Sequence, residues 1–134
     1  MLCRERFEKE YRPIFEKHGF GCTVWSPLAS GLLTGRYNDG NIPNDSRFND
    51  NPGFKHFVMS QFMNPNNKDK NLKILNDLGV YAKELGYTQT QLALAWAMAS
   101  KDSSSLILGF SKISYIDENL KALELYKKWS KEIE

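Results

Sequence analysis

The chain has 134 residues, 41% of them hydrophobic and 25% charged, which is typical of one soluble globular domain. The 18 basic and 16 acidic residues are dispersed, so nothing favours binding to nucleic acid or anionic lipid. All apolar runs are far shorter than the roughly 18 residues of a membrane span, and charged residues 4–6 closely follow Met1. We therefore expect neither membrane insertion nor a secretory signal.

The cysteine and histidine residues do not suggest a metal site. Cys3 and Cys22 lack C-x-x-C spacing, which argues against a disulfide framework or bound zinc. We interpret both as reduced thiols of a cytoplasmic protein. His18 precedes a predicted helix end, and His56 has no second ligand-type residue at helical spacing. We interpret both histidines as structural or surface residues.

The N-terminal third predicts a helix followed by a strand. Apolar spacing over residues 4–17 predicts an amphipathic helix that is bent or broken at Pro13 and ended by Gly19. Residues 22–25 are a short β-type run and predict a buried strand. Ser26 precedes Pro27, which favours an extended backbone at Ser26.

The middle of the chain predicts a long loop and two helices. Residues 38–67 are rich in Asn, Asp, Gly and Pro, and predict a functional loop with one helical turn around residues 54–62. Leucines repeating every three or four residues predict a helix over residues 68–85, ended by Gly86. Thr88 and Gln91 have capping-box spacing ahead of a second helix.

The C-terminal third predicts a second strand over residues 105–108, ending at Gly109. Ser114 and Asp117 then predict the start of a helix that runs through Leu123. Alternating strands and helices indicate an α/β fold with parallel strands. Two strands are too few to cover both faces of a parallel sheet, so the sequence predicts an incomplete one.

Two motifs resemble a known family. They are residues 25–37, WSPLASGLLTGRY, and Gly109-Phe110-Ser111-Lys112 followed by Glu118-Asn119. They resemble the seventh and eighth strand-to-helix segments of the aldo-keto reductases, NADP(H)-dependent (β/α)8 barrels that include potassium-channel β subunits. The resemblance covers almost the whole chain, whereas a complete barrel needs roughly 250 residues.

The resemblance implies the C-terminal part of a TIM barrel, with two parallel strands and about five helices. Residues 1–134 would form a single partial domain, from the helix before strand seven to the helix after strand eight. Loops after these two strands commonly hold phosphate at the mouth of such barrels. The residues implied to contact NADP(H) are Trp25, Ser26, Pro27, Leu28, Ala29, Ser30, Gly31, Arg36, Ser46, Arg47, Gly109, Ser111, Lys112, Tyr115, Glu118 and Asn119.

The resemblance also implies roles for the first loop. It would fold across the cofactor diphosphate, with Trp25 near the nicotinamide and Arg36 where many members have lysine. Glycine at positions 31 and 35 would let backbone amides approach an anion closely. Ser46 and Arg47 match a family position near the cofactor phosphates.

The second loop would hold the adenosine end of the cofactor. The segment around Ser111 and Lys112 matches the region that holds the 2′-phosphate and adenine, and Glu118 and Asn119 match the pair facing adenine. Tyr115 stands where Gln or Arg is frequent, which leaves the choice between NADP and NAD open.

Taken singly, each residue implied to contact the cofactor has an ordinary structural interpretation: turn formation for serine and glycine, a solvated charge for Lys112, and core packing for Trp25. Their joint arrangement favours a cofactor site.

We predict no catalytic residue here, because the family's Asp, Tyr, Lys and His come from the first half of the barrel. The leading hypothesis is the C-terminal half of an aldo-keto reductase, which acts on small-molecule aldehydes or ketones when complete. The alternatives are a cytoplasmic binding module resembling the β subunit of a potassium channel, and an inactive gene fragment.

Overall fold

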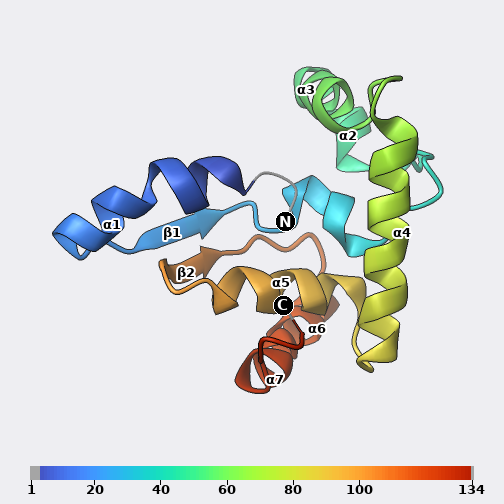
Figure 1. Ribbon diagram of the computed structural model, residues 1–134. Helices are drawn as coiled ribbons and strands as arrows, with labels where there is room; N and C mark the ends of the chain where they lie inside the picture. Colours follow the sequence, from blue (N-terminus) through green and yellow to red (C-terminus); the bar gives the residue numbers. More distant parts are fainter. Residues whose placement is uncertain (1–3, 134) are drawn as a thin grey trace. The chain divides into compact units, whose positions relative to one another are not determined.

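The computed structural model describes residues 4–133, apart from the side chains of Arg47, Phe54 and Phe57. The chain divides into two compact units. The sheet unit comprises the residues up to Ser30 and those from Thr90 onward, and the loop unit comprises Gly31–Gln89. Figure 1 shows the sheet unit in blue and in orange to red, and the loop unit in cyan to yellow.

The sheet unit contains two parallel strands, as predicted. Strand β1 (Cys22–Trp25) lies beside β2 (Ser103–Ile107), and Trp25 pairs with Ile107 (Figure 1). β1 has the predicted bounds, whereas β2 begins two residues earlier and ends one residue earlier than predicted. The early start was not predicted because serine favours turns over strands, and pairing with β1 overrides that local preference. The prediction that β1 is buried is wrong, because its residues alternate between half-buried and exposed.

The N-terminal helix is broken into two pieces, which is one of the two outcomes, a bend or a break, predicted from Pro13. A π-helical segment, η1 (Arg6–Glu10), is followed by α1 (Arg12–His18), in which Pro13 occupies the first turn. Gly19 ends α1 with φ 64°, and its N–H donates to the Phe15 carbonyl at 2.9 Å. The predicted glycine stop is therefore confirmed.

Three further helices belong wholly or mainly to the sheet unit. They are α5 (Gln89–Ala99), α6 (Ser114–Leu120) and α7 (Ala122–Lys127). The prediction of one continuous helix through Leu123 is wrong, because α6 ends at Leu120 and α7 begins at Ala122, with Lys121 as the cap residue between them. The predicted Ser114 cap is also wrong. Ile113 occupies the cap position, and the Tyr115 N–H donates to the Lys112 carbonyl, so the backbone turn closes ahead of the serine.

The loop unit is more helical than predicted. A 3₁₀ segment, η2 (Ala29–Thr34), leads into it, followed by α2 (Arg47–Asp50), α3 (Pro52–Phe62) and α4 (Lys68–Glu84). The described residues thus form seven α-helices instead of about five. Helix α4 ends as predicted, with Gly86 at φ 79°. α3 contains the helical turn predicted around residues 54–62 but is longer, and Pro52 suits its first position. α2 was not predicted, because its surroundings are rich in Asn and Pro.

Each unit has buried hydrophobic side chains of its own. In the sheet unit, Leu92, Leu94 and Leu125 are at most 2% exposed. In the loop unit, Leu75 and Phe48 are each 1% exposed, and the Phe48 ring lies 5.0 Å from the Tyr37 ring. None of the described helices combines the length and the apolar character needed to cross a bilayer.

One face of the two-stranded sheet is uncovered. Trp25 is 76% and Ile107 56% exposed, whereas the neighbouring pair Val24 and Leu106 is half-buried. Parallel sheets are normally covered on both faces because both faces are apolar. Within residues 4–133, the α/β sheet is therefore incomplete, as predicted.

Candidate functional site

The two predicted cofactor segments of the sheet unit begin at the same sheet edge. β1 and β2 are parallel and Trp25 pairs with Ile107, so the segments that follow both leave from their carboxyl ends. This edge carries ligand sites in many parallel α/β proteins. Within the described residues, the Trp25 side chain is exposed at this edge.

The first of these segments has an unusual backbone. Ser26, Ala29 and Ser30 have φ values of 53°, 47° and 59°, in the left-handed region that favours glycine. Each such non-glycine residue costs on the order of 1–3 kcal/mol, and residues of this kind cluster at functional sites. Gly31 continues the run with φ 100°. The strain at Ala29 and Ser30 had no signal in the sequence, because neither residue type favours this conformation.

The expectation of an extended Ser26 is wrong. Its carbonyl accepts a hydrogen bond from the Ala29 N–H at 2.9 Å, which closes a tight turn around Pro27 and Leu28. Turn closure therefore overrides the steric preference of a residue before proline. The turn leaves Ser26 exposed, and Pro27 and Leu28 half-buried.

The second segment presents polar groups to solvent. Gly109, Ser111 and Lys112 are all exposed. The Lys112 ammonium lies 5.6 Å from the centroid of the half-buried Tyr115 ring, an arrangement that attracts a cation to the ring face. Tyr115 thus contacts the cation of this segment.

The predicted adenine pair lies on α6. Asn119 is 8% exposed, and the backbone carbonyl of Glu118 accepts a hydrogen bond of 2.9 Å from Gln91 Nε2 on α5. This contact ties α6 to α5. The sequence predicts Gln91 only as part of a capping box. Its hydrogen bond to Glu118 was not predicted, because no local pattern connects residues 27 positions apart.

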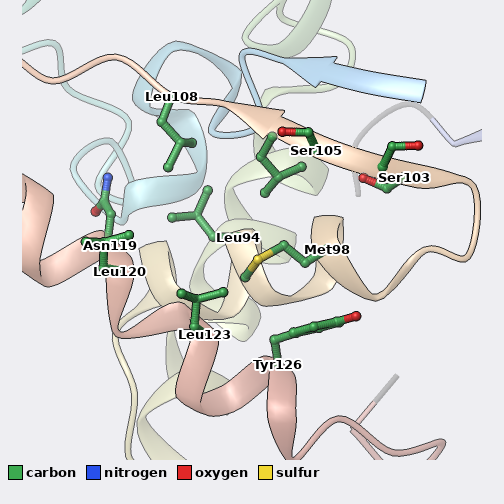
Figure 2. Close-up of a pocket in the computed structure, with 11 residues that line it drawn as sticks. Leu94, Met98, Ser103, Ser105, Leu108, Asn119, Leu120, Leu123 and Tyr126 are labelled. Carbon is green, nitrogen blue, oxygen red and sulfur yellow. The ribbon is translucent and has the colours of Figure 1, made fainter. Parts of the chain in front are cut away.

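A pocket of about 310 Å³ lies among β2, α5, α6 and α7. Figure 2 shows Leu94 and Met98 of α5 pointing toward Leu120, Leu123 and Tyr126. Among the predicted cofactor residues, only Asn119 lines this pocket, and no cationic side chain does. The largely apolar lining is unsuited to phosphate.

In the loop unit, Arg36 forms an ion pair with Asp45. The two side chains are 36% and 76% exposed, and exposed ion pairs contribute little to stability. The Arg36 side chain is thus partly exposed and carries a positive charge. Gly31 begins the same stretch, and its carbonyl accepts a hydrogen bond of 2.7 Å from the Thr34 hydroxyl.

Ser46 is a buried cap. It is 1% exposed, its Oγ accepts from the Phe48 N–H at 3.2 Å, and it lies 2.8 Å from the Tyr37 hydroxyl. The side chain thus begins α2 and anchors a packed aromatic pair. Arg47 is the first residue of α2, and its side chain lies outside the described part of the chain.

The loop unit also holds a carboxylate with a perturbed pKa. The Asn41 backbone N–H donates to Asp39 at 2.9 Å and the Asn41 side-chain amide donates at 3.0 Å, and these bonds lower the Asp39 pKa below its ordinary value of 3.8.

Throughout residues 4–133, no three His, Cys, Asp or Glu side chains gather in a way that could hold a metal ion.

Three curated proteins that are similar to this chain carry nearly the same name. "Probable voltage-gated potassium channel subunit beta" proteins from Arabidopsis thaliana and Oryza sativa subsp. japonica are each 41% identical over 128 residues, covering 93% of this chain and 36% of theirs. A "putative voltage-gated potassium channel subunit beta" from Schizosaccharomyces pombe is 42% identical over 132 residues, covering 98% and 37%. The chain spans little more than a third of the length of these curated relatives.

The model of the aldo/keto reductase family matches residues 1–134. The match includes both strands and both loops that leave their common edge. The chain belongs to the aldo/keto reductase family.

Proposed function

We propose that this chain is the NADP(H)-binding C-terminal part of an aldo-keto reductase barrel that reduces aldehydes or ketones when complete. The family generally uses NAD(P)H. The observation that carries the proposal is the common edge of β1 and β2, where a strained turn follows one strand and a lysine-bearing segment follows the other.

The chemistry of these segments suits a diphosphate ligand. Successive residues in turn and left-handed conformations direct backbone N–H groups to one side, which creates a small concavity for an anion. In the sheet unit, Ser26, Leu28 and Ser30 would supply such donors, because Pro27 has no N–H and the Ala29 N–H already donates to the Ser26 carbonyl. In the loop unit, Gly31 would supply another, and Arg36 a full positive charge.

The adenosine end would be held by the second segment. Lys112 and Ser111 would bind the 2′-phosphate, after the backbone turn at Gly109, while Tyr115 orients the lysine. Glu118 and Asn119 would contact the adenine. Trp25, with its exposed ring, would lie near the nicotinamide.

The remaining predicted residues would act less directly. Ser46 would fix the start of α2, so that Arg47 stands near the cofactor phosphates. When bound, NADPH supplies a hydride to the carbonyl carbon. The residues of this chain would bind and orient that cofactor, and the proton donor would come from another part of the barrel.

The proposal predicts that Lys112→Ala weakens NADPH binding about tenfold, because a charge-assisted hydrogen bond contributes about 1.5–3 kcal/mol. NADH, which lacks the 2′-phosphate, would be affected much less. The measurement is a fluorescence titration of the purified chain with each nucleotide. Lys101→Ala is the matched control, because that lysine is exposed and forms a surface pair with Glu16. Equal losses for NADPH and NADH would exclude a 2′-phosphate contact.

A second proposal follows from the relatives' names: the complete protein serves as a cytoplasmic β-subunit-like module of a potassium channel. The same cofactor segments would serve either role. Co-purification with a channel's cytoplasmic domain would favour the module, and aldehyde-dependent oxidation of NADPH by the complete protein would favour the reductase.

An antibody against residues 68–85 would test the remaining alternative, an inactive gene fragment. A native protein of about 35–40 kDa would fit a complete barrel with extensions. A native protein of 15.4 kDa would instead favour the fragment.

A further inference from the structure

Two side-chain amides of the loop unit join three segments. Asn38 Nδ2 donates to Gln89 Oε1 at 2.9 Å and to the Leu75 carbonyl at 3.2 Å. Gln89 is 6% exposed and is the first residue of α5, whereas Leu75 lies within α4. Within the loop unit, the segment that carries Arg36 is therefore held by α4 and by Gln89, two residues after the arginine.

Two glycines make room for this contact. A Cβ atom at Gly79 on α4 would lie 2.8 Å from Gln89 Oε1, closer than real Cβ atoms come to a neighbour. A Cβ atom at Gly35 would lie 3.1 Å from the same oxygen, and Gly35 has φ 87°. The backbone on either side of the Gln89 amide thus approaches it as closely as glycine permits.

The Asn38 backbone is held as well. Its carbonyl accepts from Asn76 Nδ2 at 2.9 Å, and the same Asn76 amide also donates to the Leu72 carbonyl on α4 at 2.9 Å. The Asn38 N–H donates to the Gly35 carbonyl at 3.3 Å, which closes a turn around Arg36. The side chain and the backbone of Asn38 therefore restrain the same four-residue stretch.

Stability alone does not explain this network. Asn38 Oδ1 and Gln89 Nε2 are buried, and neither has a hydrogen-bond partner within the described part of the chain. Leaving a buried polar atom unpaired is costly, and replacing buried polar partners by apolar groups of similar shape can be nearly neutral. The network thus restrains the loop while adding little net stability.

We propose that Asn38 and Gln89 are positioning residues that set the direction in which Arg36 leaves the loop. The part of this inference that concerns a ligand rests on the proposed function, in which Arg36 binds a cofactor phosphate. The restraint on residues 35–38 stands independently of any ligand.

Hydrogen exchange measured on two substitutions tests the restraint. Gln89→Met keeps the side-chain volume and removes the acceptor, so amides of residues 35–40 are expected to exchange about fivefold faster, as for one lost hydrogen bond. Gln89→Glu keeps an acceptor at a helix N-terminus, which favours a carboxylate, and is expected to exchange like the parent chain. Unchanged exchange in Gln89→Met, or faster exchange spread evenly over α4, would overturn the proposal.

A second variant avoids any defect in folding. Asn76 is exposed, so Asn76→Ala removes the backbone restraint without disturbing the core. It is expected to raise exchange over residues 35–40 by a smaller factor, and no change in this segment would contradict the proposed restraint.

NADPH titration of the same variants separates the two proposals. Gln89→Met is expected to weaken NADPH binding about fivefold in the parent chain and to have no effect in an Arg36→Ala background, because coupled residues are not additive. Weakening that persists without Arg36 would overturn the positioning role. If the parent chain binds no NADPH while exchange responds as expected, the proposed function fails and the restraint stands.

Discussion

The two units differ in how well each covers its own apolar side chains. In the loop unit, Ile74 and Val80 are the exposed large hydrophobic residues among those described. The sheet unit exposes such residues on β1, β2, α6 and α7, and Ile113, just before α6, is 85% exposed. The loop unit is therefore closer to self-sufficient, whereas the sheet unit has faces suited to covering by other secondary structure.

Among the substitutions that test this difference between the units, Phe48→Ala is expected to have the largest effect on stability. Phe48 is 1% exposed and packs on Tyr37, so its truncation should destabilise the loop unit by about 3–5 kcal/mol. Ile113→Ala, at an exposed position of the sheet unit, should change stability by at most about 0.5 kcal/mol. Unfolding in urea measures the change in stability of each variant, and hydrogen exchange then shows in which unit the change occurs. Similar losses for the two variants would remove the contrast between the units.

An intermediate effect is expected on self-association. Ile113→Lys and Ile107→Lys should each lower the association constant of the purified chain about tenfold, because burying one isoleucine contributes about 1.5–3 kcal/mol. Val80→Lys in the loop unit is the control, since Val80 is a comparably exposed hydrophobic residue at 59%. Light scattering over a concentration series reports the change. Equal effects at all three positions would indicate that association does not depend on the sheet unit.

The smallest effect is expected from Asp39. Hydrogen bonds from Asn41 lower its pKa in the folded chain, so the ionised group adds stability above the unfolded value of 3.8. That contribution is lost as pH falls through the lower folded pKa. An NMR titration should place the Asp39 midpoint below 3.8, and Asn41→Ala should move it upward. A midpoint at or above 3.8 in the parent chain would show that the loop does not hold the carboxylate as described.

The sequence predicted those features whose causes are local or periodic. The apolar period of α4, the glycine stops at Gly19 and Gly86, and the β-type run of β1 all act over a few neighbouring residues. α2 was missed, and α3 was predicted only as one helical turn, because Asn and Pro within residues 38–67 suggested turns. The early start of β2 depended on pairing with β1, some 80 positions away along the chain.

The candidate site shows the same division. The residue types and spacing of residues 25–37 and 109–119 suggested a family and a cofactor, and the family assignment is confirmed. The buried position of Ser46 and the Asn38–Gln89 contact depended on tertiary packing, which spacing does not encode. The contacts proposed for the cofactor remain predictions.

The left-handed residues before Gly31 limit which changes this loop can accept over evolution. Ala29 and Ser30 have small side chains, and a β-branched valine or isoleucine at either φ would be a severe steric outlier. Glycine would relieve the strain, but it would also raise the conformational entropy of the unfolded chain and make the turn less rigid. Variation at these two positions should therefore be confined to a few small residues, even though the loop lies where sequences usually vary most.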